Sequence, residues 1–118
     1  MEYIDFVPFA GQSTNIREGT IVFRVRGGKI DWKDNKRYEL FDLLVKGGRL
    51  SIVKEGKELK FIHIFEDESV VKANVSKLSN TDHQIAVTWS INRNEISLYI
   101  DGKKVASGEM NYRLSYIG

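Results

Sequence analysis

The segment "HQIAVTWSINRNEISLYIDGKKVAS", residues 83–107, constrains the fold of this chain more than any other stretch. Apolar side chains recur at every second position along residues 85–89 and again along residues 96–100. A period of two is typical of half-buried β-strands. Asp101-Gly102 follows directly, and this dipeptide is a strong hairpin signal because both turn positions favour a positive φ. The segment therefore predicts three antiparallel strands joined by two turns.

Further strands are predicted along the rest of the chain, with glycine turns between some of them. Residues 2–7 and 19–27 each alternate between two faces. Residues 39–65 contain three apolar runs, which are separated by glycine-containing turns at positions 47–48 and 55–56. Glycine supplies the positive φ that a tight hairpin needs. This part of the chain therefore predicts a series of hairpins.

The remaining segments complete an all-β pattern. Residues 66–69, "EDES", predict a polar break, and residues 70–76 predict a further strand. The only helix candidate is a single turn within residues 75–83. About ten short strands without a helical period predict an antiparallel β-sandwich or barrel. We expect these side chains to point between two sheets: Ile21, Phe23, Leu50, Ile52, Val87, Trp89, Leu98 and Ile100.

Length and composition exclude several classes of protein. The 118 residues predict a single domain spanning residues 1–118, which is long enough to bury a core. The net charge of +2, from 18 basic and 16 acidic side chains, is too balanced to predict nucleic-acid binding. The absence of cysteine excludes disulfides, thiolate zinc sites and thiol nucleophiles.

The sequence also lacks the usual membrane signals. No apolar run approaches the ~20 residues that a membrane-spanning helix needs, so we expect no membrane insertion. The first residues, "MEYIDFVPFAG", lack the basic and apolar regions of a signal peptide. The localisation stays open between cytoplasmic synthesis, a virion, and a fragment of an extracellular protein.

Three segments carry a resemblance to a known fold. "EGTIVFRVR" is similar to a strand of the form "GTISFWV", residues 83–89 to "W-H-x-I-A-V-T-W", and residues 98–106 to "L-Y-V-D-G-x-x-V-A". In this way the chain resembles the concanavalin A-like jelly rolls of the laminin-G and pentraxin type. The resemblance covers most of the chain and implies an antiparallel β-sandwich. It does not name a ligand, because this fold hosts lectins, adhesion modules, glycanases and structural proteins.

Two departures from that family bear on assembly. Asp82 stands where the family usually carries a tryptophan. The family also continues beyond a strand like "NYRLSYIG" into a last strand of the form "F-x-G-x-I-D-E-V-x-I-Y", and this sequence ends at Gly118 before it. The resemblance therefore implies a jelly roll that is compact or lacks its last strand, with an open edge beside residues 2–7. We expect a partner across that edge, in a homo-oligomer or a larger assembly.

The sequence predicts no catalytic site. Glycanases of this fold use carboxylates at alternate positions of one strand, as in "E-x-D-x-x-E". Glu66 and Glu68 share a face if the chain is extended, but no third carboxylate follows at that spacing, so we interpret them as a solvated turn. His63 and His83 have neither a neighbouring nucleophile nor a compact metal-binding spacing, and are interpreted as packed or solvated.

The segment "KIDWKDNKRYE" is the best candidate for a binding site. An exposed aromatic ring beside polar side chains suits sugar recognition, which needs an apolar platform and directional hydrogen bonds. Trp32 fits that description, but it is equally a candidate for a subunit contact or for core packing. The candidate ligand-binding residues are Asp31, Trp32, Asp34, Asn35, Arg37 and Tyr38.

No cofactor is expected, with one alternative left open. Asp31, Asp34 and Asn35 would supply oxygen ligands for calcium, as loop residues do in laminin-G and pentraxin-like domains. The fixed ligand spacing of a strong calcium loop is absent, however. We therefore favour a polar turn at this segment.

These observations lead to two main hypotheses about function. The first is a non-catalytic binding module, most plausibly for carbohydrate, whose partner is a glycan or a protein surface. The alternative is a structural protein of a virus or phage particle, such as a capsid decoration or fibre subunit. A divergent glycanase is the least favoured interpretation, because the required carboxylate set is missing.

Overall fold

The structure, a computed structural model, describes residues 2–3, 13–14, 16–45, 47–65 and 67–110. This part of the chain consists of strands, turns and loops, and contains no helix. No segment in it is therefore a helix that could cross a membrane. The strands are β1 (Glu2–Tyr3), β2 (Ser13–Thr14), β3 (Glu18–Val25), β4 (Arg37–Val45), β5 (Gly48–Glu55), β6 (Glu58–Phe65), β7 (Asp67–Asn74), β8 (His83–Ser90), β9 (Glu95–Ile100) and β10 (Lys103–Gly108).

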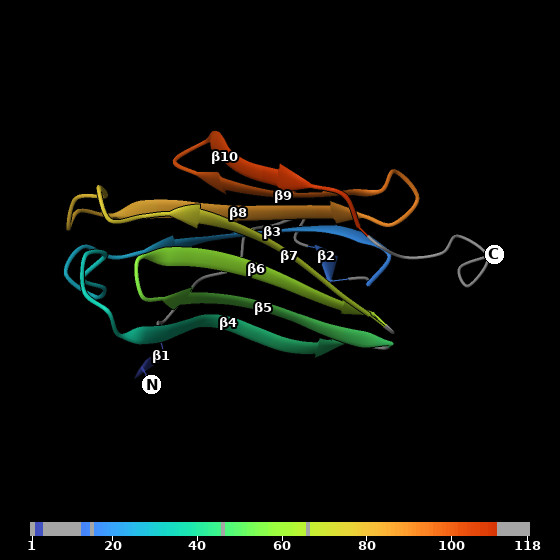
Figure 1. Ribbon diagram of the computed structural model, residues 1–118, viewed down its shortest axis with the longest axis horizontal. Helices are drawn as coiled ribbons and strands as arrows, with labels where there is room; N and C mark the ends of the chain where they lie inside the picture. Colours follow the sequence, from blue (N-terminus) through green and yellow to red (C-terminus); the bar gives the residue numbers. More distant parts are fainter. Residues whose placement is uncertain (1, 4–12, 15, 46, 66, 111–118) are drawn as a thin grey trace.

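The strands form two five-stranded sheets that pack face to face (Figure 1). Sheet A has the order β1-β4-β5-β6-β7, and sheet B has the order β10-β9-β8-β3-β2. Every neighbouring pair is antiparallel except β1 and β4, which pair in parallel through two residues. The predicted antiparallel β-sandwich is confirmed.

The tight turns have the backbone conformation that the sequence predicts. Gly47 and Gly56 have φ angles of 94° and 59°, and they follow β4 and β5. Asp101 and Gly102 have φ angles of 52° and 80°, so both central residues of the β9–β10 turn are left-handed. That combination is the one expected of a two-residue hairpin whose twist matches its strands.

The core lies between the two sheets, and its predicted members are confirmed. The eight predicted side chains are 6% exposed or less: Ile21, Phe23, Leu50, Ile52, Val87, Trp89, Leu98 and Ile100. Trp89 of sheet B lies with its ring centre 5.8 Å from that of Phe61 in sheet A. Because inward positions alternate along each strand, the two apolar faces meet and exclude water.

Two predictions about local structure are wrong. The polar break predicted over residues 66–69 is shorter, because β7 already begins at Asp67 and Glu68 is registered with Ile64 of β6. Charged side chains at a sheet edge face solvent and do not end a strand. The helix candidate within residues 75–83 is only a hydrogen-bonded turn, in which the amide of Leu78 donates to the carbonyl of Val75 over 3.1 Å.

Part of the N-terminal prediction lies outside the described residues. Of the strand predicted over residues 2–7, the structure describes Glu2–Tyr3, which is β1. Residues 4–7 and the segment that resembles the family's "YIG" strand, residues 111–118, are not described. The expected open edge beside residues 2–7 stays a prediction.

Candidate functional site

The loop between β3 and β4 does not present Trp32 as a surface platform. The Trp32 side chain is only 1% exposed and belongs to the core. Its indole meets the imidazole of His83 edge to face, with ring centres 5.9 Å apart. The interpretation of Trp32 as an exposed sugar platform is therefore wrong, and the packing alternative is the one observed. The loop folds inward because burying so large an apolar ring is favourable.

The polar residues of the same loop bind one another. Lys54 of β5 is fully buried, and its Nζ donates to Oδ1 of Asp34 over 2.7 Å. The Tyr38 hydroxyl donates to the other carboxylate oxygen of Asp34, also over 2.7 Å. Burial alone would raise the pKa of Asp34, but the Lys54 and Tyr38 hydrogen bonds outweigh it and hold this pKa at about 2. The network compensates a buried ammonium group, as a buried charge requires.

The remaining candidates of this loop are at the surface. Asp31 accepts a hydrogen bond from the Lys33 amide, and Arg37 forms an ion pair with Glu55 over 3.1 Å. Asn35 is exposed. Calcium ligation by Asp31, Asp34 and Asn35 stays a prediction, although the Lys54 ammonium group already neutralises Asp34.

Both histidines are packed. His63 is fully buried, and its Nε2 lies 2.7 Å from the carbonyl oxygen of Ile16. Burial lowers the pKa of His63. His83 directs Nδ1 to the Asp101 carboxylate over 2.7 Å and Nε2 to the carbonyl of Ser79 over 2.8 Å. Burial opposes the charge on His83, but the Asp101 carboxylate and this carbonyl together raise its pKa.

The outer face of sheet A carries a hydrogen-bonded pair of carboxyl groups, those of Glu39 and Asp42. Asp42 of β4 accepts hydrogen bonds from Arg49 Nε over 2.7 Å and from the Ser51 hydroxyl over 2.9 Å. The hydrogen bond from Arg49 is the main reason that the pKa of Asp42 falls to about 2. Burial and its hydrogen bond to Asp42 raise the pKa of Glu39. The two carboxyl groups form hydrogen bonds with each other, and Asp42 also accepts one from Arg49, so we interpret the cluster as structural.

The outer face of sheet B presents a different set of side chains. Strand register places Thr20 beside Thr88, Thr88 beside Ser97, and Ser97 beside Ser107. These four side chains belong to β3, β8, β9 and β10, on the face opposite the core; Ser107 is exposed, Thr20 and Thr88 are half-buried, and Ser97 is only 5% exposed. Tyr99 flanks this row of hydroxyls on β9, two positions after Ser97. Alternation along the strands produces the row, since each apolar inward residue leaves a polar outward neighbour.

Two adjoining hollows lie over this row, and together we call them the sheet B groove. The first has a volume of about 410 Å³ and the second about 440 Å³. Arg93 and Glu95, at the β8–β9 turn, line both hollows. The other lining residues are Glu18, Gly19, Thr20, Thr88, Trp89, Ser90 and Tyr99 in the first, and Asn94, Ser97, Lys104, Ser107, Gly108 and Glu109 in the second.

The turn that carries Arg93 is held in place by hydrogen bonds between side chains and backbone amides. Asn94 has a left-handed φ of 57°, and its side-chain oxygen accepts the Met110 amide over 2.8 Å. The Ser90 hydroxyl accepts the Arg93 amide over 3.2 Å. Lys104 Nζ lies 5.7 Å from the centre of the Tyr99 ring, within the range of a cation–π contact. The groove therefore combines an aromatic ring, hydroxyls and charges of both signs on a rigid sheet.

The sequence pattern identified the outward-facing residues of single strands, but it did not predict that these residues lie side by side in one groove. Thr88, Ser97 and Tyr99 all occupy positions opposite the apolar parity of their strands. What the sequence lacked was the strand order, because β3 neighbours β8 across more than fifty intervening residues. The signal available was a polar face made of hydroxyl and aromatic side chains.

Comparison with known proteins supports the fold and nothing finer. No protein-family model matches this chain, and no curated protein matches it. A solved structure of a mutant of HCR/D, a botulinum neurotoxin domain, superposes with a TM-score of 0.56 at 11% sequence identity. The superposition covers 91% of this chain and 34% of the other, so this chain spans about a third of that protein's length. At this identity the likeness shows a shared β-sandwich fold.

Proposed function

We propose that this chain is a concanavalin A-like domain of the laminin-G and pentraxin type that binds carbohydrate without cleaving it, within a larger assembly. The ligand lies in the sheet B groove, in contact with the hydroxyls of the row that solvent reaches, those of Thr20, Thr88 and Ser107. We propose this site in place of the loop around Trp32, because the Trp32 side chain is part of the core. The sequence resemblance to the family supports the choice of fold type.

One observation carries the proposal: the row of hydroxyls beside Tyr99 on an outward sheet face. Sugars offer hydroxyl groups that both donate and accept hydrogen bonds, and Ser and Thr hydroxyls do the same. Sugar rings also have apolar C–H faces that pack on an aromatic ring. Arg93 and Glu95, which line both hollows, add a charged donor and a charged acceptor.

The arrangement of carboxylates favours binding over hydrolysis. Glu18 and Glu95 are the acidic side chains at the two sides of the first hollow. Both are registered with Ser90, so one strand separates them. Two strand spacings amount to about 9–10 Å, which is too far for the ~5 Å carboxyl pair of a retaining glycosidase and lies at the upper end of the ~6.5–9.5 Å range of inverting ones. This spacing speaks against a retaining mechanism at Glu18 and Glu95, and Glu66 and Glu68 lack the third carboxylate of the glycanase pattern, so we expect no glycanase activity.

A glycan array followed by titration with the best binder tests the proposal. Tyr99→Ala should weaken binding by about tenfold or more, since an aromatic platform contributes on the order of 1 kcal/mol beyond its buried area. Arg93→Ala and Arg24→Ala form a matched pair, because both arginines are exposed on sheet B but only Arg93 lines the groove. Only Arg93→Ala should weaken binding. Equal effects of the two arginine variants, or no glycan bound at all, would contradict the proposal.

A further inference from the structure

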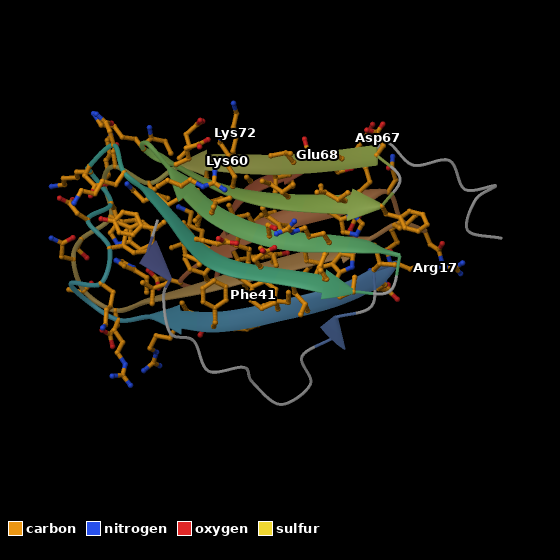
Figure 2. All side chains as sticks on the ribbon, turned by 90° about the horizontal axis from the view of Figure 1, so that it is seen from below. Arg17, Phe41, Lys60, Asp67, Glu68 and Lys72 are labelled. Carbon is orange, nitrogen blue, oxygen red and sulfur yellow. The ribbon has the colours of Figure 1, made fainter. Side chains whose placement is uncertain are left out.

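Strand β7 is an open edge of sheet A in the described part of the chain. It is the last strand in the order β1-β4-β5-β6-β7, and its eight residues, Asp67–Asn74, pair with β6 without a bulge. A long regular edge offers a row of backbone donors and acceptors to another strand. Figure 2 shows β7 along the upper margin of sheet A, beyond β6. This edge is therefore able to accept a further strand.

The side chains on the outer face of β7 have a self-complementary order. Glu68, Val70 and Lys72 alternate with the inward residues Ser69 and Val71, which are buried. Val70 is 44% exposed, although valine is apolar. Figure 2 labels Glu68 and Lys72 on β7, and Val70 lies midway between them in the sequence. A negative charge, an apolar residue and a positive charge thus follow one another at equal spacing.

The environment of Lys72 within one copy is unfavourable. Its partner across the β6–β7 ladder is Lys60, another cation. Lys60 forms its ion pair with Glu55 over 3.1 Å, whereas Lys72 is 61% exposed and reaches Glu58 only at 3.8 Å. Like charges directly opposite one another destabilise a sheet. A further carboxylate beyond the edge would relieve this repulsion.

We propose that β7 pairs in an antiparallel manner with β7 of a second copy of this chain. Val70 then lies opposite Val70 of the second copy, on a two-fold axis. In that register each Glu68 faces Lys72 of the second copy, so the two ion pairs form at once. The two A sheets become one continuous sheet, and the interface is isologous, as is usual in homodimers.

The register follows from strand parity. A slip of one residue would bring an outward side chain of one copy against an inward side chain of the other. A slip of two residues would place Val70 opposite Glu68 or Lys72 and lose both ion pairs between Glu68 and Lys72. Parallel pairing would place Glu68 against Glu68 and Lys72 against Lys72, which is repulsive.

The other sheet edges are poorer candidates. Strand β10 has a register shift between Lys104 and Ala106, and it begins with two lysines. Bulges and lysines are common means of protecting an edge from pairing. Strands β1 and β2 contain only two residues each. Among the described strands, β7 alone is long, regular and matched in charge to itself.

Variants that reverse the charge of Glu68 or of Lys72 test this interface. Sedimentation equilibrium should show a dimer of the unmodified chain. Glu68→Lys and Lys72→Glu, made singly, each set like charges against each other twice. Each should raise the dissociation constant by about tenfold or more. An equimolar mixture of the two variants should recover dimers, because one copy then presents two cations and the other two anions.

The double variant, E68K with K72E, restores opposite charges within one chain and should also dimerise. Arg24→Glu on β3 is the control: it makes the same change of charge at an exposed position of sheet B, away from β7, and it should leave the dimer intact. A monomeric unmodified chain would overturn the proposal. It would equally be overturned by single variants that still dimerise, or by a mixture that stays monomeric. The groove lies on the other sheet, so glycan binding and this interface succeed or fail separately.

Discussion

At the scale of single residues, the two histidines respond to protonation in opposite ways. Both ring nitrogens of His83 face acceptors, which only the doubly protonated imidazolium satisfies. His63 is fully buried, and its Nε2 lies 2.7 Å from the carbonyl oxygen of Ile16. We expect a proton NMR titration to give His83 a pKa above the ordinary value of about 6.5 and His63 a pKa below it. Asp101→Asn should lower the pKa of His83 alone.

The same shifts set the sign of the stability change with pH. The raised pKa of His83 adds stability that is fully present below about pH 6.5 and is lost as the pH rises through the folded pKa. The lowered pKa of His63 removes stability as the pH falls below about 6.5, because the unfolded chain then takes up the proton more readily. Urea unfolding of the Asp101→Asn variant should therefore lose the His83 contribution and keep that of His63. A pKa of His83 that Asp101→Asn leaves unchanged would contradict the assignment.

At the scale of elements, the β4–β5 hairpin depends on close backbone packing at Gly48. A Cβ atom added to Gly48 would lie 1.9 Å from the carbonyl oxygen of Ile64, on the neighbouring strand β6. Backbone at that distance has to move, so we expect Gly48→Ala to destabilise the fold by several kcal/mol, on the order of other severe steric changes. Urea unfolding followed by circular dichroism measures the loss.

Gly56 is the matched control for this hairpin prediction. Its φ of 59° is left-handed, but no atom lies within 4 Å of an added Cβ. Gly56→Ala should therefore cost only about 1 kcal/mol, from backbone conformation alone. Equal costs for Gly48→Ala and Gly56→Ala would show that the contact with Ile64 does not limit the hairpin.

At the scale of the whole molecule, Trp89 joins the two sheets. It is 2% exposed, belongs to sheet B, and its ring lies 5.8 Å from Phe61 and 6.2 Å from His63, both in sheet A. We expect Trp89→Ala to lower the free energy of unfolding by about 3–5 kcal/mol, as emptying a large aromatic site does. Leu44→Ala, at a side chain that is 76% exposed, should change it by less than about 0.5 kcal/mol.

Because the two sheets share one core, we expect the described strands to unfold in a single cooperative transition. In the Trp89→Ala variant, Trp32 is the remaining tryptophan, and it is buried at the end of the sandwich. Its fluorescence should change at the same denaturant concentration as the circular dichroism of the sheets, because a single small domain unfolds in one step. Two separate transitions would contradict a shared core.

The sequence by itself determined the strands, the turns and the side chains that face inward. These properties depend on neighbours one to four positions apart: alternation decides which face of a strand is buried, and Asp101-Gly102 determines a left-handed turn. Local chemistry also predicted an all-β fold, apart from the single-turn helix candidate within residues 75–83, where the structure has a hydrogen-bonded turn. The eight predicted core residues were found for this reason.

Only the tertiary structure decided where Trp32 lies and which outward residues share a surface. The polarity of the residues around Trp32 suggested that its side chain is exposed, but this side chain is buried in the core. The ammonium group of Lys54 is also buried, and it forms an ion pair with Asp34. The row Thr20, Thr88, Ser97 and Ser107 exists because four strands from distant parts of the sequence pair in one register. Strand order results from competition among all pairings for burial of the whole core, so no local pattern contains it.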